Sequence, residues 1–440
     1  MTERLVMDTY SALQGGRQTF EGVAGRVVHR LSLGALRSTS SVASPDWANS
    51  DPKGAWWRAY LEGSVPVPGV VESRVLRTVD LFCGPGGLAN GLKALCSDLG
   101  VTVVSELAVD QDPNATVVYA ANHGTRRRST DSVARLVDFS VRKRPEGADF
   151  TYPPDLTDRG LSQAINGVDL VLAGPPCQGH SNLNNHTRRE DPRNSLYLTV
   201  PAFAVAIGAP MCIIENVPAV LNDSTRVVEI ARSLFERNGY HVETGMLSAA
   251  HMGWPQTRRR HFLVARREVP PIPLDTVART LGEDSPRSVW WAIGDLEDIT
   301  SDSLLDAVTG LSAENVSRID WLFDNDEHDL ALPERPVSHR GGTTYTAVYG
   351  RLQKDAPSQT ITTGFMSPGR GRYVHPTRRR VLTAHEAARI QGFPDTYAFN
   401  PNPSQPPTRA LLAKWIGDAV PMPLGYGAAL SALGGGLGQE

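Results

Sequence analysis

The chain has 440 residues, of which 40% are hydrophobic and 21% charged, and its formal net charge is −3. This composition indicates a globular protein of two or three domains and excludes fibrous proteins and small disulfide-stapled domains. Four scattered cysteines offer neither a disulfide framework nor paired metal ligands, so no metal is expected. Prolines and a glycine interrupt the one long uncharged stretch (195–214), which we interpret as a buried helix and strand, not a membrane span. The charged N-terminus argues against secretion, so we expect a cytoplasmic protein.

Residues 1–75 contain no interpretable motif and are expected to form an N-terminal extension of unknown role. From residue 76 to 268, apolar runs typical of strands alternate with helical periodicity. Strands are predicted at 75–82, 101–110, 167–174, 211–217, 241–250 and 259–268, and helices at 88–99 and 112–123. This alternation predicts an α/β fold with a doubly wound, mostly parallel sheet.

A proline-rich junction at 269–274 ends this first domain (76–268). The polar and glycine-rich sequence that follows predicts a smaller, less regular domain at 269–405. Helical periodicity resumes at 408–420, so residues 406–440 are expected to return to the first domain as a helix.

Charge is distributed unevenly along the chain. Residues 126–144 include seven basic and two acidic side chains, and 369–380 include five arginines and no acid. Residues 283–335, by contrast, include fourteen acidic and three basic side chains. Local basic patches can bind a polyanion even where the total charge is near zero.

A glycine-rich turn, Asp80-Leu-Phe-Cys-Gly-Pro-Gly-Gly87, joins the first predicted strand to a helix. Glycines there allow a ligand to approach the backbone, at the sheet edge where α/β proteins bind ligands. Asp110 ends the next strand, where a carboxylate can accept hydrogen bonds from ribose hydroxyls. The pair fits a nucleoside-bearing cofactor with a short tail, such as S-adenosylmethionine. The alternative is a tight turn that only packs.

Cys177 follows two stiffening prolines at the end of another predicted strand. Its polar loop near a helix start favours the thiolate and suits a nucleophile. Cys83, Cys96 and Cys212 lie in or beside apolar segments and are interpreted as structural.

Glu215 ends the strand MCII, where a buried acid can donate a proton to a bound base. A carboxylate that caps a helix is the alternative. Arg258 and Arg260 alternate before the last strand, so both should face one side and could hold an anion or a carbonyl oxygen. A solvated charge run is the alternative for the arginines.

Six motifs, taken in order, resemble those of the DNA cytosine-C5 methyltransferase family, of bacterial type. They are DLFCGPGGL, GPPCQG, ENV, QTRRR, RVLTAHEAARIQGFPD (380–395) and IGDAVP (416–421). The resemblance covers about 76–268 and 349–430. It implies a Rossmann-like catalytic domain that uses S-adenosylmethionine and releases S-adenosylhomocysteine, a smaller target-recognition domain, and a cytosine flipped out of double-stranded DNA.

Carried over by position, the resemblance implies that Cys177 attacks C6 of cytosine and that Glu215 protonates or hydrogen-bonds N3. Arg258 and Arg260 would orient the base. The implied cofactor-binding residues are Asp80, Phe82, Gly84, Gly86, Gly87, Asp110, Asp155, Pro176, Asp418 and Val420. Asp418 departs from the asparagine usual in the last motif.

DNA contacts are expected at Gln178 and Ser181 in the cysteine loop, and at Arg370, Arg372 and Arg378 in the basic stretch. Because acidic loops repel phosphate, we place base recognition at 336–378 and expect the acidic segment to face solvent or a partner. The protein is expected to act as a monomer on DNA in the bacterial nucleoid, with a cognate restriction endonuclease as a candidate partner.

Two other hypotheses remain open at this point. One keeps the chemistry but takes tRNA or another RNA as substrate, since a branch of the family shares these motifs. The DPRNSLY continuation and the late basic stretch favour DNA. The other is a catalytically silent DNA-binding protein, which the intact cysteine, glutamate and arginine pair argue against.

Overall fold

The structure is a computed structural model that describes residues 16–43, 50–69, 74–176, 196–299, 301–340 and 347–434. The chain divides into two compact units. The first unit comprises Met1–Ser248, Arg259–Gly282 and Met422–Glu440, and the second comprises Ala249–Arg258 and Glu283–Pro421.

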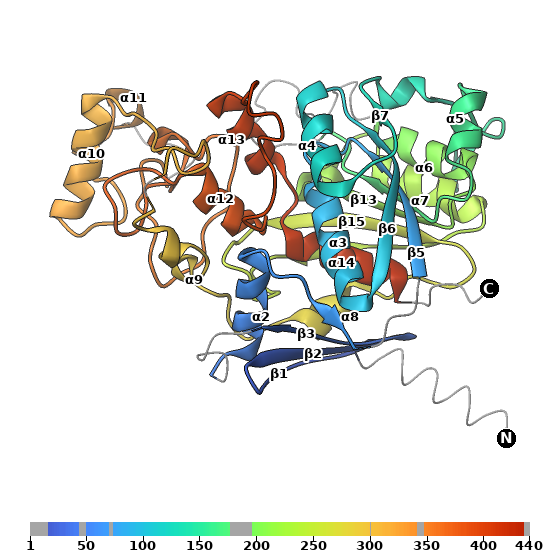
Figure 1. The fold of residues 1–440 in the computed structure, drawn as a ribbon. Helices are drawn as coiled ribbons and strands as arrows, with labels where there is room; N and C mark the ends of the chain where they lie inside the picture. The colour runs from blue at the N-terminus through green and yellow to red at the C-terminus, as the bar shows by residue number, and fades with distance from the viewer. Residues whose placement is uncertain are drawn as a thin grey trace. The chain divides into compact units, whose positions relative to one another are not determined.

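A seven-stranded sheet forms the centre of the first unit, in the order β14-β15-β13-β12-β5-β6-β7 (Figure 1). Only β15 runs antiparallel to its neighbours in this sheet. The strands are β5 (Arg74–Leu81), β6 (Val101–Val109), β7 (Arg128–Ser129), β12 (Leu170–Ala173), β13 (Met211–Asn216), β14 (His241–Ser248) and β15 (Arg259–Arg266). The six predicted strands and the doubly wound, mostly parallel α/β fold are therefore confirmed.

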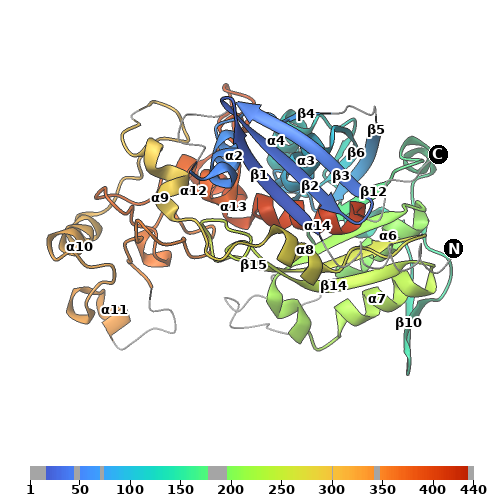
Figure 2. The ribbon, with the colours of Figure 1, turned by 90° about the horizontal axis from the view of Figure 1, so that it is seen from below.

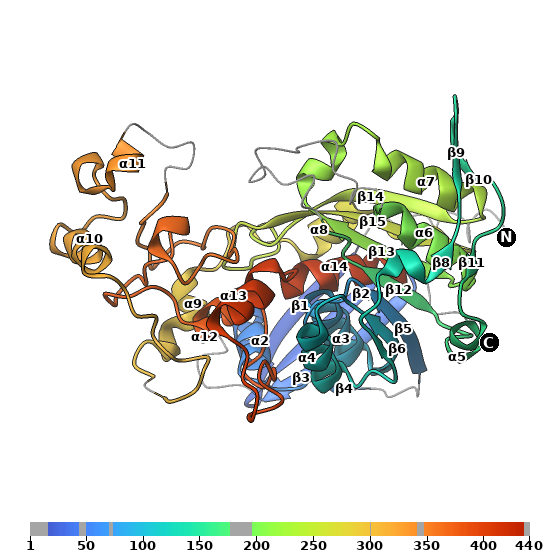
Figure 3. The ribbon, with the colours of Figure 1, turned by 90° about the horizontal axis from the view of Figure 1, so that it is seen from above.

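Helices cover both faces of the sheet (Figure 3). One face packs against α3 (Gly87–Leu99), α4 (Pro113–His123), α8 (Leu274–Leu281) and α14 (Met422–Leu433). The other packs against α6 (Leu196–Ala206) and α7 (Val227–Arg237). Because both faces are covered, strands such as β12 and β13 are buried along their whole length. The uncharged stretch is α6 followed by β13, as predicted, and no described helix could cross a bilayer.

Short elements follow β7 at the edge of the sheet. They are η2 (Val133–Arg135), β8 (Val137–Asp138), β9 (Val141–Arg144), β10 (Gly147–Phe150), β11 (Asp155–Leu156) and α5 (Arg159–Ala164). β9 and β10 form a hairpin, and β10 packs against α7 (Figure 3). The basic segment 126–144 therefore forms this edge, and one of its arginines, Arg126, pairs with the buried Glu106 at 2.9 Å.

Close backbone contact joins α3 to α14, which the sequence pattern did not predict. A Cβ on Gly91 would lie 2.5 Å from the backbone nitrogen of Tyr426, and one on Gly425 would lie 2.9 Å from the Leu88 oxygen. Both positions therefore require glycine. All twelve residues of α14 are buried, so this helix forms part of the core of the first unit.

The described part of residues 1–75 is an antiparallel sheet with one helix. Its elements are β1 (Arg17–Val23), β2 (Arg26–Leu33), β3 (Leu36–Ala43), α2 (Pro52–Leu61), and β4 (Val67–Pro68). The backbone nitrogen of Ala35 donates to Gly434, and the Tyr60 hydroxyl donates to Asn90 in α3. Figure 2 shows the sheet alongside α8. These residues thus belong to the first unit.

The second unit has few regular elements, as expected. Its helices are α9 (Val289–Ile293), η5 (Gly294–Leu296), α10 (Ala313–Asp324), η6 (Leu332–Glu334), α11 (Val337–Arg340), η7 (Pro368–Arg370), α12 (Ala384–Gln391) and α13 (Arg409–Asp418). The segment 406–440 is divided between the units, because α13 packs on α12 while α14 packs on α3.

Candidate active site

The carboxyl ends of β5, β12 and β13 converge on one edge of the sheet in the first unit. A Cβ placed on Gly174 would lie 3.6 Å from Oε2 of Glu215 and 3.9 Å from the backbone oxygen of Phe82. The side-chain amide of Asn216 donates to the Pro175 carbonyl, which ties the start of the cysteine loop to β13. The sheet thus brings together three of the sequence motifs, as the strand pattern predicted.

Glu215 is almost fully buried at this edge and pairs with Arg260 of β15. The Nε of Arg260 lies 2.8 Å from Oε1 of Glu215, and the two side chains are only 13% and 11% exposed. A buried carboxylate needs such a partner, because burial of an isolated charge is costly. The pair places a hydrogen-bonding carboxyl group beside Gly174, at the start of the cysteine loop, which suits contact with a polar edge of a base.

The glycine-rich turn keeps its backbone close to Asp110. The Gly84 nitrogen donates to Oδ2 of Asp110 at 2.8 Å, and the Asp112 nitrogen donates to Oδ1 at 2.8 Å. Phe82 has φ +56°, a left-handed conformation that costs roughly 1 kcal/mol or more for a bulky residue. No atom of the described residues lies within 4 Å of the position of a Cβ on Gly84. The turn is therefore open on that side.

These features fit a nucleoside-bearing cofactor. The Asp110 carboxylate is part-buried and each of its oxygens still has acceptor capacity for a hydroxyl. Gly86 (φ +102°) begins α3 as its N-cap, and Gly87 is the first residue of that helix. A helix N-terminus and an unobstructed backbone are suited to a polar ligand.

Three other residues predicted to bind the cofactor, Asp80, Asp155 and Pro176, lie differently from the glycines of the turn. Asp80 is only 1% exposed, so its carboxyl group lies beneath the turn. Burial, aided by the nearby Asp110 charge, raises its pKa well above the usual range, although a Tyr119 hydrogen bond opposes this. Asp155 begins β11 and is exposed, and Pro176 is partly buried just after β12.

Cys177, Gln178 and Ser181 lie outside the described residues. The three other cysteines are buried and free. Burial is the main cause that raises the pKa of Cys96, to about 12, and the pKa values of Cys83 and Cys212 are raised as well. A thiol with a raised pKa is a poor nucleophile. This supports the interpretation of these three as structural.

In the second unit, Arg258 binds backbone carbonyl groups. Its Nη1 donates to Ile361 at 2.7 Å and to Gly417 at 2.9 Å, and its Nη2 donates to Asp418 at 3.3 Å. The guanidinium therefore holds the last motif in place. The predicted alternation of Arg258 and Arg260 is present, but the two side chains have partners in different units. Arg258 binds carbonyl groups of the second unit, and Arg260 pairs with Glu215 of the first.

The last motif is fixed from a second direction by two buried glutamines. Gln256 donates to the side chain of Gln391, which in turn donates to the carbonyl groups of Ile416 and Ala419. Asp418 points its carboxylate to Lys414 at 3.0 Å and is exposed, whereas Val420 is buried. Three motifs that are separate in the sequence thus form one hydrogen-bonded layer, which periodicity could not reveal.

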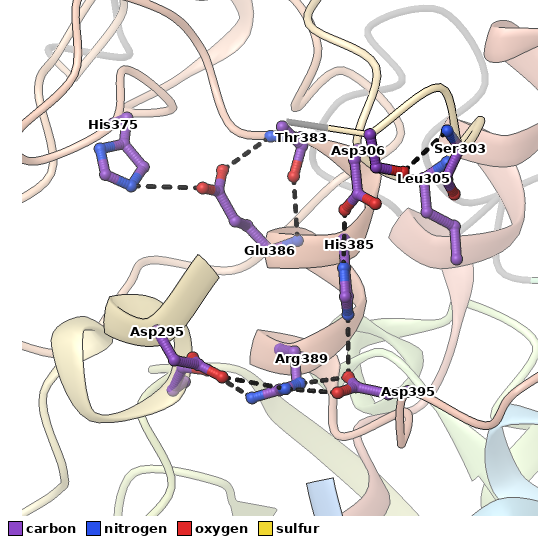
Figure 4. Close-up of polar contacts among 12 residues, drawn as sticks. Asp295, Ser303, Leu305, Asp306, His375, Thr383, His385, Glu386, Arg389 and Asp395 are labelled. Carbon is purple, nitrogen blue, oxygen red and sulfur yellow. Dashed lines mark hydrogen bonds and ion pairs between the residues drawn. The ribbon is translucent and has the colours of Figure 1, made fainter. Parts of the chain in front are cut away.

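The acidic segment pairs with α12, and α12 pairs in turn with Asp395, which follows it (Figure 4). His385 lies 2.8 Å from both Asp306 and Asp395, and Arg389 pairs with Asp395 and Asp295. Burial opposes protonation of His385, but its two carboxylate partners outweigh burial and raise its pKa.

A second buried cluster lies at the start of α12. Thr383 and Glu386 form a capping box, and Glu386 also accepts from Arg380 at 2.7 Å and lies 3.3 Å from His375. Burial would raise the pKa of Glu386, but Arg380 and His375 lower it to about 2. Ion pairs and charged hydrogen bonds therefore fix much of the segment RVLTAHEAARIQGFPD in place.

The basic stretch, too, pairs with the acidic segment. Arg372 lies 2.6 Å from Asp329, Arg378 pairs with Glu297 and Asp298, and Arg379 pairs with Asp320 and Asp324. The acidic segment thus neutralises arginines of its own unit, an arrangement that the sequence did not suggest. Arg370 is exposed and has no carboxylate partner among the residues that the structure describes.

Comparison with known proteins agrees with these motifs. The family model for the C-5 cytosine-specific DNA methylase matches residues 76–431. The type II methyltransferase M1.BsuMI of Bacillus subtilis is 32% identical over 409 residues, which cover 93% of this chain and 92% of the relative. M.DdeI of Desulfomicrobium norvegicum is 27% identical, covering 79% of this chain and 86% of the relative.

Solved structures support the fold. The Dnmt2 methyltransferase of S. pombe superposes with a TM-score of 0.54 at 18% identity, covering 81% of this chain and 98% of that one. The family model spans most of the chain, and the relative from B. subtilis spans nearly all of it. The chain therefore belongs to the C-5 cytosine-specific DNA methylase family.

Proposed function

We propose that this protein methylates C5 of a cytosine flipped out of double-stranded DNA, through a covalent bond between Cys177 and C6. The methyl donor is S-adenosylmethionine, as in other C5 DNA methyltransferases. The observation that carries the proposal is the buried Glu215–Arg260 pair, which lies beside the start of the cysteine loop and at the same sheet edge as the glycine-rich turn.

The chain's own residues divide the chemistry between them. Addition of the Cys177 thiolate to C6 would make C5 nucleophilic, because electron density moves into the C4–C5–C6 system. Glu215 would hydrogen-bond or protonate N3, and Arg260 would keep its carboxyl group in position. When bound, S-adenosylmethionine supplies an electrophilic methyl group and leaves as S-adenosylhomocysteine. Loss of the C5 proton then allows the thiolate to depart.

Arg258 has a different role in this proposal. Its guanidinium is occupied by three backbone carbonyl groups, so it acts by holding the segment that contains Asp418 and Val420. We infer that these two residues and the turn residues Phe82, Gly84, Gly86 and Gly87 line the cofactor, with Asp110 at the ribose. Asp155 and Pro176 complete the proposed set, and Gln178 and Ser181 would contact DNA.

The biological setting is proposed from the relatives. M1.BsuMI and M.DdeI are named type II methyltransferases. We infer that this protein, too, is the modification enzyme of a bacterial restriction system, acting as a monomer on nucleoid DNA, with a cognate endonuclease as partner.

Expression in a methylation-deficient bacterium tests the function. We expect bisulfite sequencing of plasmid DNA to show protected cytosines at one short recurring sequence. Cells that carry the empty vector supply the control. Complete conversion of every cytosine, despite soluble protein, would contradict DNA methylation by this chain.

Replacement of Arg370 should weaken DNA binding in a salt-dependent way. Because this exposed guanidinium has no carboxylate partner among the described residues, it is available to a phosphate. We expect Arg370→Ala to lower the slope of log affinity against log salt by about 0.9. Arg379→Ala is the matched control, because Arg379 is already paired with Asp320 and Asp324. This variant should leave the slope unchanged. Equal slopes for Arg370→Ala and the wild type would remove Arg370 from the DNA surface.

A further inference from the structure

The sheet of β1 to β4 has one face that neither the sequence motifs nor the proposed function uses. Figure 2 shows β1, β2 and β3 side by side. Buried residues alternate with more exposed ones along β2 and β3, because successive side chains of a strand point to opposite faces. One face, with Val27, Leu31 and Leu36, belongs to the core of the first unit. The other face carries polar side chains.

Arginine and hydroxyl side chains form two rows across this polar face. In the first row, Ser32 of β2 is paired with Arg17 of β1 on one side and with Arg37 of β3 on the other. The second row has an arginine between two threonines, in the order Thr19, Arg30 and Thr39. Directly paired residues lie on the same face of a sheet, with Cβ atoms about 5 Å apart. Three guanidinium groups and three hydroxyl groups therefore share one surface.

The two rows line a hollow of about 950 Å³. Gly69 beside β4 and the last residues of α3, Asp98 and Leu99, also contribute to its lining. The hollow thus lies at the end of α3, whereas the glycine-rich turn lies at the start of that helix. The thirteen residues of α3 span about 20 Å. A ligand in the hollow would therefore lie outside the candidate active site.

Two arginines of the rows are available to an anion. Residues 16–43 contain four arginines and one glutamate, with no lysine or aspartate, although the whole chain has a net charge of −3. Arg17 and Arg37 are exposed and have no carboxylate partner among the residues that the structure describes. Nη1 of Arg37 donates to the backbone carbonyl groups of Gly34 and Leu36, both at 2.7 Å. These two bonds orient the guanidinium and use only one of its three nitrogens.

Both acids that line the hollow already have partners. Asp98 is 1% exposed and accepts a hydrogen bond from the Tyr426 hydroxyl at 2.8 Å, so its carboxylate belongs to the core. Glu21 is exposed and pairs with Arg30 at 2.7 Å. Neither acid cancels the charge of Arg17 or Arg37, and the surface therefore stays positive.

This combination of side chains suits the phosphate backbone of DNA. Arginine, serine and threonine side chains supply many of the hydrogen bonds that proteins make to phosphate oxygens. Binding of unpaired bases uses aromatic side chains as stacking platforms. The aromatic residue of β1, Phe20, instead stacks on the buried His29 with ring centroids 4.4 Å apart. The surface is therefore suited to a duplex whose bases stay paired.

We propose that the polar face of the N-terminal sheet is a second DNA-contact surface, which binds the phosphate backbone of a duplex without reading its sequence. The proposal goes beyond the proposed function, because no step of methyl transfer uses this face. Each phosphate contact releases counterions, so the surface should add salt-dependent affinity for any duplex. An acidic protein segment is the other occupant that the charge would fit, and the experiment distinguishes the two.

Fluorescence anisotropy with a labelled duplex of A·T pairs alone, over a salt series, tests the proposal. This duplex contains no cytosine, so the result does not depend on methylation. We expect Arg17→Ala/Arg37→Ala to lower the slope of log affinity against log salt by about 1.8, since each phosphate contact contributes about 0.9. Arg17→Lys/Arg37→Lys should keep most of the slope, because it retains both charges. Glu21→Gln releases Arg30 and should tighten binding and raise the slope.

Arg237→Ala is the matched control. Arg237 is also exposed, but it lies in the last turn of α7, on the other face of the central sheet. Its replacement should leave the slope unchanged, and kcat at saturating DNA should stay near wild type in every variant. An unchanged slope in Arg17→Ala/Arg37→Ala, or an equal decrease in Arg237→Ala, would overturn the proposal. Labelled polyglutamate that loses affinity in Arg17→Ala/Arg37→Ala, while the DNA slope stays constant, would assign the face to an acidic protein instead.

Discussion

Cys177→Ser should abolish methyl transfer while the protein remains folded and still binds S-adenosylhomocysteine. Serine has nearly the same size as cysteine, but its hydroxyl is far less acidic and cannot add to C6 at neutral pH. Removal of a covalent nucleophile can lower turnover by about 10⁴-fold or more. Tritium transfer from labelled donor to plasmid DNA measures the loss.

Cys96→Ser provides the matched control for this variant. Cys96 lies in α3, is 1% exposed and has a raised pKa, so the same substitution there should leave turnover per folded molecule close to wild type. A second measurement tests the covalent bond directly. DNA with 5-fluorocytosine at the target should yield a denaturant-resistant complex with the wild type and none with Cys177→Ser. Near-normal turnover by Cys177→Ser would exclude Cys177 as the nucleophile.

Glu215→Gln should lower kcat by roughly 10²- to 10⁴-fold, the range typical of a lost general acid or base. The amide keeps the shape of the side chain but cannot protonate N3, and it leaves Arg260 without its carboxylate at 2.8 Å. Affinity for S-adenosylhomocysteine should stay near wild type, because Glu215 is not among the residues proposed to bind the cofactor. Single-turnover kinetics with saturating donor measure the chemical step.

Glu106→Gln is the matched control for the stability effect of this change. Glu106 is 1% exposed and pairs with Arg77 and Arg126 in the same sheet, away from the proposed site. If Glu106→Gln and Glu215→Gln lower kcat equally, the loss reflects a disturbed sheet, and a role for Glu215 in the chemistry would be contradicted.

Local pattern was sufficient to predict the catalytic half of the fold. Alternating apolar runs and helical periodicity depend on neighbouring residues, so all six predicted strands of the central sheet are present in the structure. Phe82, Gly174 and Glu215 lie at the carboxyl ends of three parallel strands, and they come together because such strands end at one edge of a sheet. The order of six motifs was enough to indicate the family, which the family model confirms.

Other elements were missed because their stability comes from partners far away in the sequence. Strands β3 and β4 of the N-terminal sheet pack against α3, and the backbone of Ala35, between β2 and β3, donates to Gly434. A C-terminal helix that returns to the first domain was expected, but the close packing of α14 on α3 at Gly91 and Gly425 was not, because it depends on two glycines far apart in the sequence.

The sequence by itself determined the family, the central sheet and the candidate residues, because each depends on spacing along the chain. Only the tertiary structure determined which ion-pair and hydrogen-bond partners those residues have. It paired Glu215 with Arg260 and directed Arg258 to three carbonyl groups. In the second unit it paired acidic residues with arginines up to 94 positions away. Pairing between distant residues leaves no periodic trace in a sequence, because it depends only on where the folded backbone places them.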